Sequence, residues 1–343
     1  SILESRSLLR YADNDAKVFL PHPGSSTTPE SPENVSLANL DTNDPLVTAG
    51  SLAISKSCDT SDENVRIRTC ADLAPIVVPG FDPSLVCGSL AVNFGYGWAV
   101  HYILAFCEAT HRAESDATNG LNYSPYDDLA DYDSDEIFSD EFAEVHAYYH
   151  LNKVSAFLSS LGHSISTPLH ALVNVTAPSP ELLDCAKTGW EEEDDKSDKD
   201  RAREIISACT TEDVGYMGVD NAFYLNDDTA SLVDVETGIY LFQGSKADFA
   251  YDGDIIYHEF GHALADQVSS LGGGQFEDSF GINDSPGALN EGFADYFSSA
   301  LAEDGVVGGY VGERIYGNGG SIRTLEHSMK CPDYWNGEVH DDS

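Results

Sequence analysis

The sequence predicts an α+β protein, and two kinds of pattern support this class. Short apolar runs separated by Gly, Pro, Ser and Thr fill residues 20–120, which is typical of β-strands. In the second half, segments with apolar residues at helical spacing alternate with shorter apolar runs. The expected helices begin near residues 141, 252 and 285, and the expected strands span about 169–175, 222–224 and 238–242.

Composition divides most of the chain into three segments. Residues 18–137 form the β-rich N-terminal region, which ends in an acidic linker. Residues 138–271 are expected to form an α+β domain, interrupted by a charged run at 190–203 that is expected to be exposed. Residues 272–343 are expected to be largely helical.

The segment His258-Glu259-Phe260-Gly261-His262 carries the clearest chemical signal. The helix around it would be capped by Asp252 or Asp254. Residues four apart lie on one face of a helix, so His258 and His262 can bind one metal ion. Glu259 lies beside that face, where it can act as a general base toward a zinc-activated water.

A second helix supplies the expected third ligand. Ser285 followed by Pro286 is a helix-start pattern, with serine as the cap and proline in the first turn. Glu291 and Asp295 then fall one turn apart on one face, within an apolar and aromatic stretch. We therefore expect Glu291 to be a zinc ligand and Asp295 to hold a ligating histidine by its other ring nitrogen.

A second pair of histidines, His146 and His150, has the same four-residue spacing within the helix near residue 141. This pair has no neighbouring acid at the second position and is surrounded by apolar residues. We interpret both histidines as structural.

These motifs together resemble one group of enzymes. His258-Glu259-x-x-His262 followed by Asn290-Glu291-x-x-Ala294-Asp295 resembles the thermolysin-type and fungalysin-type zinc metalloendopeptidases. The resemblance implies a thermolysin-like zincin catalytic domain, one catalytic zinc ion, and protein or peptide substrates. It covers roughly the second half of the chain.

Further matches imply roles for other residues. Asn221-Ala222-Phe223-Tyr224 is similar to the Asn-Ala-Phe-Trp stretch of the family, whose edge strand pairs with substrate. Asn221 would then bind the peptide through its side chain, and Ala222 through its carbonyl. Arg323 matches the arginine that binds a substrate carbonyl, and His340 matches the histidine that stabilises the oxyanion.

The resemblance also predicts features at the two ends of the chain and between the motifs. Val18-Phe19-Leu20-Pro21-His22-Pro23 is similar to the start of mature fungalysins, so residues 1–17 would be the tail of a propeptide, a possible partner. The chain stops three residues after His340, so the C-terminal helical subdomain of the family would be truncated. A longer loop before Glu291 could bind calcium through Glu277 and Asp278.

Charge and cysteine content set outer limits. Acidic residues outnumber basic ones 59 to 17, and the net charge of −42 excludes nucleic acid and anionic membranes as natural partners. No run is long and apolar enough to span a membrane, and the seven cysteines fit an extracellular protein, secreted or at the cell surface. Cys58–Cys70 and Cys185–Cys209 are candidate disulfides, although connectivity cannot be derived from sequence.

The expected function is therefore a secreted zinc metalloendopeptidase. Zinc would be held by three side chains, Glu259 would move the proton, and His340 and Arg323 would stabilise negative charge. Two alternatives stay open at this point. The chain could be a catalytically silent, metal-binding relative that serves as a surface or binding module, or a zinc hydrolase of non-peptide acyl bonds.

Overall fold

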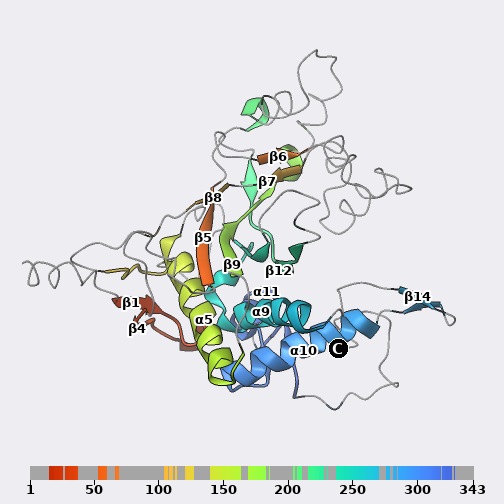
Figure 1. Cartoon of the computed structure of the whole chain (residues 1–343). Coiled ribbons are helices and arrows are strands. Elements are labelled where there is room, and N and C mark those ends of the chain that lie inside the picture. The colour runs from red at the N-terminus through yellow and green to blue at the C-terminus, as the bar shows by residue number, and fades with distance from the viewer. Residues whose placement is uncertain are drawn as a thin grey trace, which may run out of the picture.

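The structure is a computed structural model, and its main elements are a mixed sheet and a group of long helices (Figure 1). It describes residues 15–25, 28–37, 53–59, 66–68, 104–106, 108–110, 113, 120–126, 140–163, 169–182, 185, 204, 207–210, 215–227, 230, 237–269, 276–278, 281–283, 285–317, 319–326 and 328.

A five-stranded sheet has the order β12-β13-β9-β5-β8. The three central strands run parallel, and an antiparallel strand closes each side. This arrangement leaves β12 at one edge of the sheet. The bounds are β5 Ala53–Asp59, β8 Glu108–Thr110, β9 Leu169–Val175, β12 Ala222–Leu225 and β13 Gly238–Phe242.

The remaining strands form short two-stranded pairs. Among the described residues before Asp140, all regular elements are strands, which agrees with the prediction that this region is rich in β-structure. The pairs are β1 Asp15–Val18 with β4 Glu33–Ser36, β2 Gly24–Ser25 with β3 Thr28–Pro29, β6 Arg66–Arg68 with β7 Leu104–Phe106, β10 Ala177–Pro178 with β11 Tyr216–Met217, β14 Phe276–Asp278 with β15 Gly281–Asn283, and β16 Val306–Val307 with β17 Arg323–Thr324.

Helices cover the sheet in layers, with α9 between the sheet and α10 (Figure 1). Each of the two helices nearest the sheet begins at an aspartate cap: Asp140 accepts from the Phe142 amide at 2.8 Å, and Asp252 accepts from the Asp254 amide at 3.1 Å. None of the described helices is long and apolar enough to cross a membrane. The bounds are α5 Glu141–Ser160, α9 Gly253–Val268, α10 Ser285–Ala302, α11 Gly309–Tyr316, and the short 3₁₀ helix η2 Phe249–Tyr251.

The segment after β1 connects the N-terminal region to the helices. The Gly253 amide donates to the Pro21 carbonyl at 3.0 Å, at the start of α9. His150 of α5 lies 3.1 Å from the Phe19 carbonyl through Nε2 and 2.6 Å from the Tyr257 hydroxyl through Nδ1. Because a carbonyl only accepts, Nε2 carries the proton and Nδ1 accepts from Tyr257. Burial keeps this ring neutral by lowering its pKa, which is consistent with the structural role predicted for His150.

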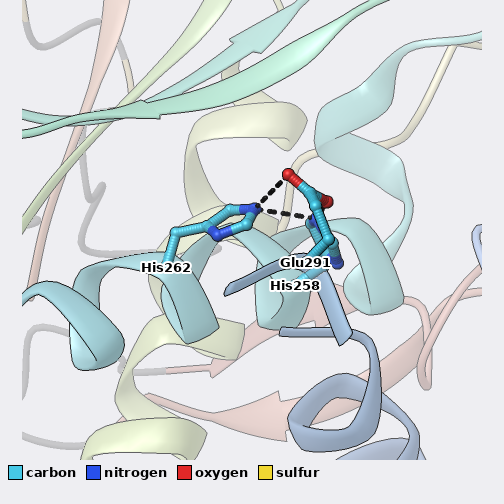
Figure 2. Close-up of side chains that lie close together, drawn as sticks. All are labelled: His258, His262 and Glu291. Carbon is cyan, nitrogen blue, oxygen red and sulfur yellow. Dashed lines mark hydrogen bonds and ion pairs between the residues drawn. The ribbon is translucent and has the colours of Figure 1, made fainter. Parts of the chain in front are cut away.

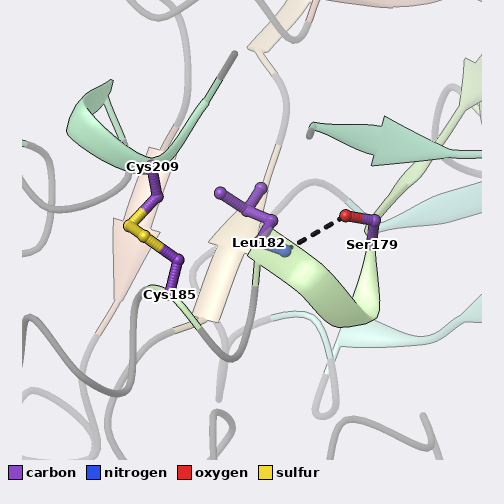
Figure 3. Close-up of a disulfide and its surroundings, with 4 residues drawn as sticks. All are labelled: Ser179, Leu182, Cys185 and Cys209. Atoms are coloured by element: carbon purple, nitrogen blue, oxygen red, sulfur yellow. Dashed lines mark hydrogen bonds between the residues drawn. A yellow bond between two sulfur atoms is a disulfide. The ribbon is translucent and has the colours of Figure 1, made fainter. Parts of the chain in front are cut away.

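The predicted disulfide Cys185–Cys209 is confirmed, with a Cα–Cα distance of 5.7 Å (Figure 3). Leu182 lies beside it, and its amide donates to the Ser179 hydroxyl at 3.1 Å. The disulfide joins the two sides of the segment that contains the charged run at 190–203, which lies outside the described residues. Cys70, and with it the second candidate disulfide, also lies outside them.

The five-stranded sheet combines strands from two of the expected segments. β5 and β8 come from the N-terminal region, and β9, β12 and β13 come from the α+β segment. Ala53 pairs in parallel with Leu169, so the sheet continues across the boundary placed at residue 137. The α+β class is confirmed, and the N-terminal region contributes directly to the layer beside the site.

Candidate metal centre

Helix α9 presents two histidines on one side and buries most of its remaining surface. His258 is 4% exposed and Glu259 is 5% exposed, and apolar residues such as Ile256 and Phe260 contact the core. The predicted cap at Asp252 fixes where the helix begins. The two histidines are therefore held at the surface of a rigid, well-packed helix.

Helix α10 runs antiparallel to α9 and is held against it at several points. The Ser298 hydroxyl donates to the Asp254 carbonyl at 2.6 Å, near the start of α9. The rings of Phe260 and Phe297 stack with centroids 6.0 Å apart. These contacts place the N-terminal half of α10 opposite the histidines.

His258, His262 and Glu291 converge on one point between the two helices (Figure 2). The two Nε2 atoms are 3.0 Å apart. The Glu291 carboxylate lies 3.3 Å from His258 Nε2 and 3.4 Å from His262 Nε2. These three predicted ligands form the one group of His, Cys, Asp and Glu side chains in the described part of the chain that could hold a metal ion.

The other ring nitrogens also have partners. His258 Nδ1 lies 2.8 Å from Asp295 Oδ1, and His262 Nδ1 lies 3.2 Å from Asn290 Oδ1. Both partner atoms are acceptors, so each Nδ1 donates to its partner and the Nε2 atom of each ring is the one that faces Glu291. Two ring nitrogens and a carboxylate therefore face one another, an arrangement that could hold a metal ion.

The contact of Asp295 with His258 was predicted from the sequence, but that of Asn290 with His262 was not. The signal was present in the sequence, because Asn290 directly precedes Glu291 on the same helix. A helix that brings a ligand to the metal also brings the neighbouring residues close to the histidine rings. Residues of this kind orient metal ligands and raise their affinity.

Arg323, in β17, forms a bidentate pair with Asp295. Its Nε and Nη2 atoms lie 2.6 Å and 2.9 Å from the two carboxylate oxygens. Nη2 is 3.2 Å from His258 Nδ1 and 3.1 Å from His258 Nε2. Because these distances are nearly equal, the guanidinium cannot lie along the lone pair of Nε2 and leaves that direction open.

The charges around the centre favour a positive ion there. Burial opposes protonation of His258, but its contacts with Asp295 and Glu291 outweigh this and raise its pKa to about 9. Burial likewise opposes ionisation of Asp295, but its bonds to His258 and Arg323 lower its pKa to about 2. Asp295 is therefore a carboxylate across the working pH range, and it strengthens the basicity of His258.

Glu259 lies beside the centre in a buried position. Its Oε2 atom has no hydrogen-bond partner among the described residues. Burial raises its pKa, although His258 and His262 partly offset this. A carboxyl group with a raised pKa and an oxygen open for a new bond is a stronger proton acceptor than an exposed glutamate.

The edge strand β12 packs against α9, with Ala222 opposite Leu241. The Phe242 amide donates to the Asn221 carbonyl, so alternation along the antiparallel pair directs the Ala222 carbonyl toward the outer edge. The Asn221 side chain accepts from the Ala222 amide at 3.0 Å. Beyond the histidines, the Tyr224 hydroxyl donates to Asp266 of α9 at 3.3 Å.

Several predicted residues cannot be placed by the structure. His340 and residues 1–14 lie outside the described residues. β14 and β15 form a hairpin in the loop between α9 and α10, but the side chains of Glu277 and Asp278 are not among those described. The predicted calcium site and the role of His340 stay predictions.

Three comparisons with known proteins gave no match. The chain matches no protein-family model, no curated protein and no solved structure.

Proposed function

We propose that this protein is a zinc metalloendopeptidase with a thermolysin-like catalytic domain. The observation that carries the proposal is the convergence of two histidine nitrogens and a carboxylate on one point between two helices. Tetrahedral zinc with bonds of about 2.0–2.1 Å places its ligand atoms about 3.3–3.4 Å apart. The separations of 3.0, 3.3 and 3.4 Å between His258, His262 and Glu291 are close to this value.

Zinc bound by this ligand set would keep one open position and would lower the pKa of water to about 7 while polarising a carbonyl group. Glu259 is the base in this proposal. It takes a proton from the attacking water and returns it to the leaving amine as the peptide bond breaks. Its burial supports this role, because burial raises the pKa of the carboxyl group and makes Glu259 a stronger base than an exposed glutamate.

Arg323 is proposed to stabilise the negative charge that develops on substrate. Asp295 holds its guanidinium in place, and Nη2 lies 3.7 Å from the Glu291 carboxylate. A fixed cation beside the metal ligands costs no reorganisation during the reaction. His340 is proposed as a second donor to the oxyanion.

Peptide substrates are supported by the position of β12. Its outer edge offers the Ala222 carbonyl to an extended chain, which is the geometry of β-augmentation, and the Asn221 side chain is proposed as a further partner of the peptide. The strand packs on the helix that carries the histidines. A peptide added to this edge would run along the metal centre rather than away from it.

We further propose that the protein acts outside the cell. The disulfide Cys185–Cys209 supports this, because such bonds persist in oxidising compartments. Calcium at Glu277 and Asp278, and a propeptide ending near residue 17, belong to the same proposal.

The test is zinc analysis of the purified chain together with cleavage of unfolded casein. Glu259→Gln should keep zinc and lose about 10²–10⁴-fold in cleavage rate, because only the proton acceptor is removed. Glu326→Gln, at an exposed position, is the matched control and should cleave as the parent does. Phenanthroline should abolish the activity of both the parent and the control.

The outcomes separate the alternatives. If Glu259→Gln cleaved casein as fast as the parent, the assignment of the base would be wrong. A parent that binds zinc and leaves casein intact would instead be the silent metal-binding protein, unless it hydrolyses a chromogenic ester, which would identify an acyl hydrolase of another class.

A further inference from the structure

The two helices that hold the metal ligands pack closely at Gly261 and Ala294. A Cβ atom added at Gly261 would lie 2.7 Å from Ala294 Cα and 3.0 Å from Ala294 Cβ. Gly261 directly precedes the ligand His262, and Ala294 lies between Glu291 and Asp295. The contact is therefore at the centre of the site, although neither residue can bind a metal or move a proton.

We infer that Gly261 is a positioning residue for the metal centre. Because glycine has no side chain, α10 can pack close enough to α9 for Glu291 to reach the two histidines. The inference rests on the metal-binding part of the proposed function and is independent of peptide cleavage. It assigns a role to a position between the two histidine ligands where a side chain would meet the main chain of the neighbouring helix.

The displacement caused by a side chain at this position can be worked out from the geometry. Contacts of a real Cβ atom begin near 3.4 Å, so α10 would have to retreat by about 0.7 Å at Ala294. The neighbouring atom is a main-chain carbon, so no rotation of a side chain relieves the clash. The retreat has to be made by the helix.

The points at which α10 is attached to α9 determine how far Glu291 moves when α10 is displaced at Ala294. Ser298 fixes the helix to the Asp254 carbonyl one turn beyond Ala294, and Phe297 stacks on Phe260. With the pivot at Ser298, the rise of 1.5 Å per residue places Ala294 about 6 Å and Glu291 about 10.5 Å from it. A shift of about 0.7 Å at Ala294 then grows to about 1.2 Å at Glu291.

A shift of that size exceeds what a metal site tolerates. Ligand distances in a well-formed site stay within about 0.2 Å of their ordinary values. Asp295 would move as well, and with it the bond of 2.8 Å to His258 Nδ1. Rotation of the Glu291 side chain can absorb part of the change, so weakened binding is expected rather than complete loss.

The experiment is a competition titration with zinc on the full chain carrying Gly261→Ala. The expected result is a zinc affinity about 10–100-fold weaker than that of the parent, the size found when groups that orient ligands are removed. The visible spectrum of the cobalt-substituted protein should change too, since it reports the coordination geometry. Gln267→Ala, on the exposed end of α9, is the matched control and should leave both measurements unchanged.

A second substitution distinguishes this mechanism from a general loss of stability. Ala294→Gly removes the side chain on the other helix, so zinc affinity should stay within about threefold of the parent. Added to Gly261→Ala, it should fail to restore affinity, because the contact at 2.7 Å is with Ala294 Cα, which remains. If Gly261→Ala does not fold, Ala294→Val, whose side chain is stiff in a helix, tests the same contact with the same expected loss.

The possible results are distinct. Parent-like zinc affinity in folded Gly261→Ala, or in Ala294→Val, would overturn the inference and leave the proposed function intact. Weakened binding in a protein that cleaves no peptide would support the inference and refute the proteolytic function. A parent that binds no zinc would overturn both.

Discussion

Asp295→Asn tests the charge arrangement around the metal centre most directly. Asp295 is 2% exposed and bonds to His258 at 2.8 Å and to Arg323 at 2.6 Å and 2.9 Å. The amide that replaces it has one acceptor oxygen. If that oxygen faces His258, the amide NH₂ group meets the N–H donors of Arg323. If the oxygen instead faces Arg323, the NH₂ group meets the N–H donor of His258 Nδ1. In both cases a donor faces a donor.

Asp295→Asn should lower both the zinc affinity and the free energy of unfolding, and these two effects can be measured separately. Weaker orientation of His258 should reduce zinc affinity by about 10–100-fold, or about 1.4–2.7 kcal/mol. Removing one partner of a fully buried ion pair costs roughly 3–5 kcal/mol. The Arg323 side chain is 21% exposed, so we expect a smaller loss of about 2–3 kcal/mol in the free energy of unfolding of the metal-free protein.

The assays are zinc titration against a chelator of known affinity and urea denaturation in the presence of that chelator. Asp266→Asn is the control, because Asp266 lies on the same helix as the histidines and accepts one exposed hydrogen bond from Tyr224. It should change the free energy of unfolding by less than about 1 kcal/mol. If Asp295→Asn kept both the zinc affinity and the urea midpoint of the parent, the assigned arrangement would be wrong.

Three further predictions follow from the same contacts. Because the pKa of His258 is raised to about 9, zinc should displace about one proton at pH 7 and fewer as the pH rises through 9. Calorimetry in buffers of different ionisation enthalpy measures this number of protons. In the metal-free protein the same pKa shift stabilises the fold fully below pH 6.5, and that stability is lost as the pH rises through about 9. Asn290→Ala should weaken zinc binding by about 10-fold while leaving cleavage dependent on Glu259, and an unchanged affinity would show that Asn290 does not orient His262. Replacing Cys185 and Cys209 together by serine should lower the free energy of unfolding by roughly 3 kcal/mol, since the disulfide closes a loop with a sequence separation of 24, and equal urea midpoints for the variant and the parent would contradict this.

Local patterns gave reliable predictions of the elements around the site. The helix predicted to begin near residue 141 is observed as Glu141–Ser160, and the strand predicted at about 169–175 is observed as Leu169–Val175. The histidine spacing predicted one face of α9 because residues four apart share a face in any helix. Placing Glu291 opposite that face needed only the assumption that the next helix packs against it.

Features that depend on distant parts of the chain were harder to predict. The parallel pairing of β5 with β9 joins strands more than 100 residues apart, and no local pattern specifies such a partner. The bidentate contact of Arg323 with Asp295 depends on a crossing of β17 with α10 that periodicity does not encode. The Gly261 contact was missed because a glycine inside a helix gives no sign of what lies against it.

The contacts of Pro21 and Phe19 with α9 and α5 have a consequence for biosynthesis. The first turn of the histidine-bearing helix is held by main chain that is synthesised more than 200 residues earlier, so this contact forms only after the helix itself has been made. The order of synthesis therefore makes assembly of the metal centre a late event in maturation. A polypeptide that begins after residue 25 would have every proposed ligand and still lack the support under that first turn.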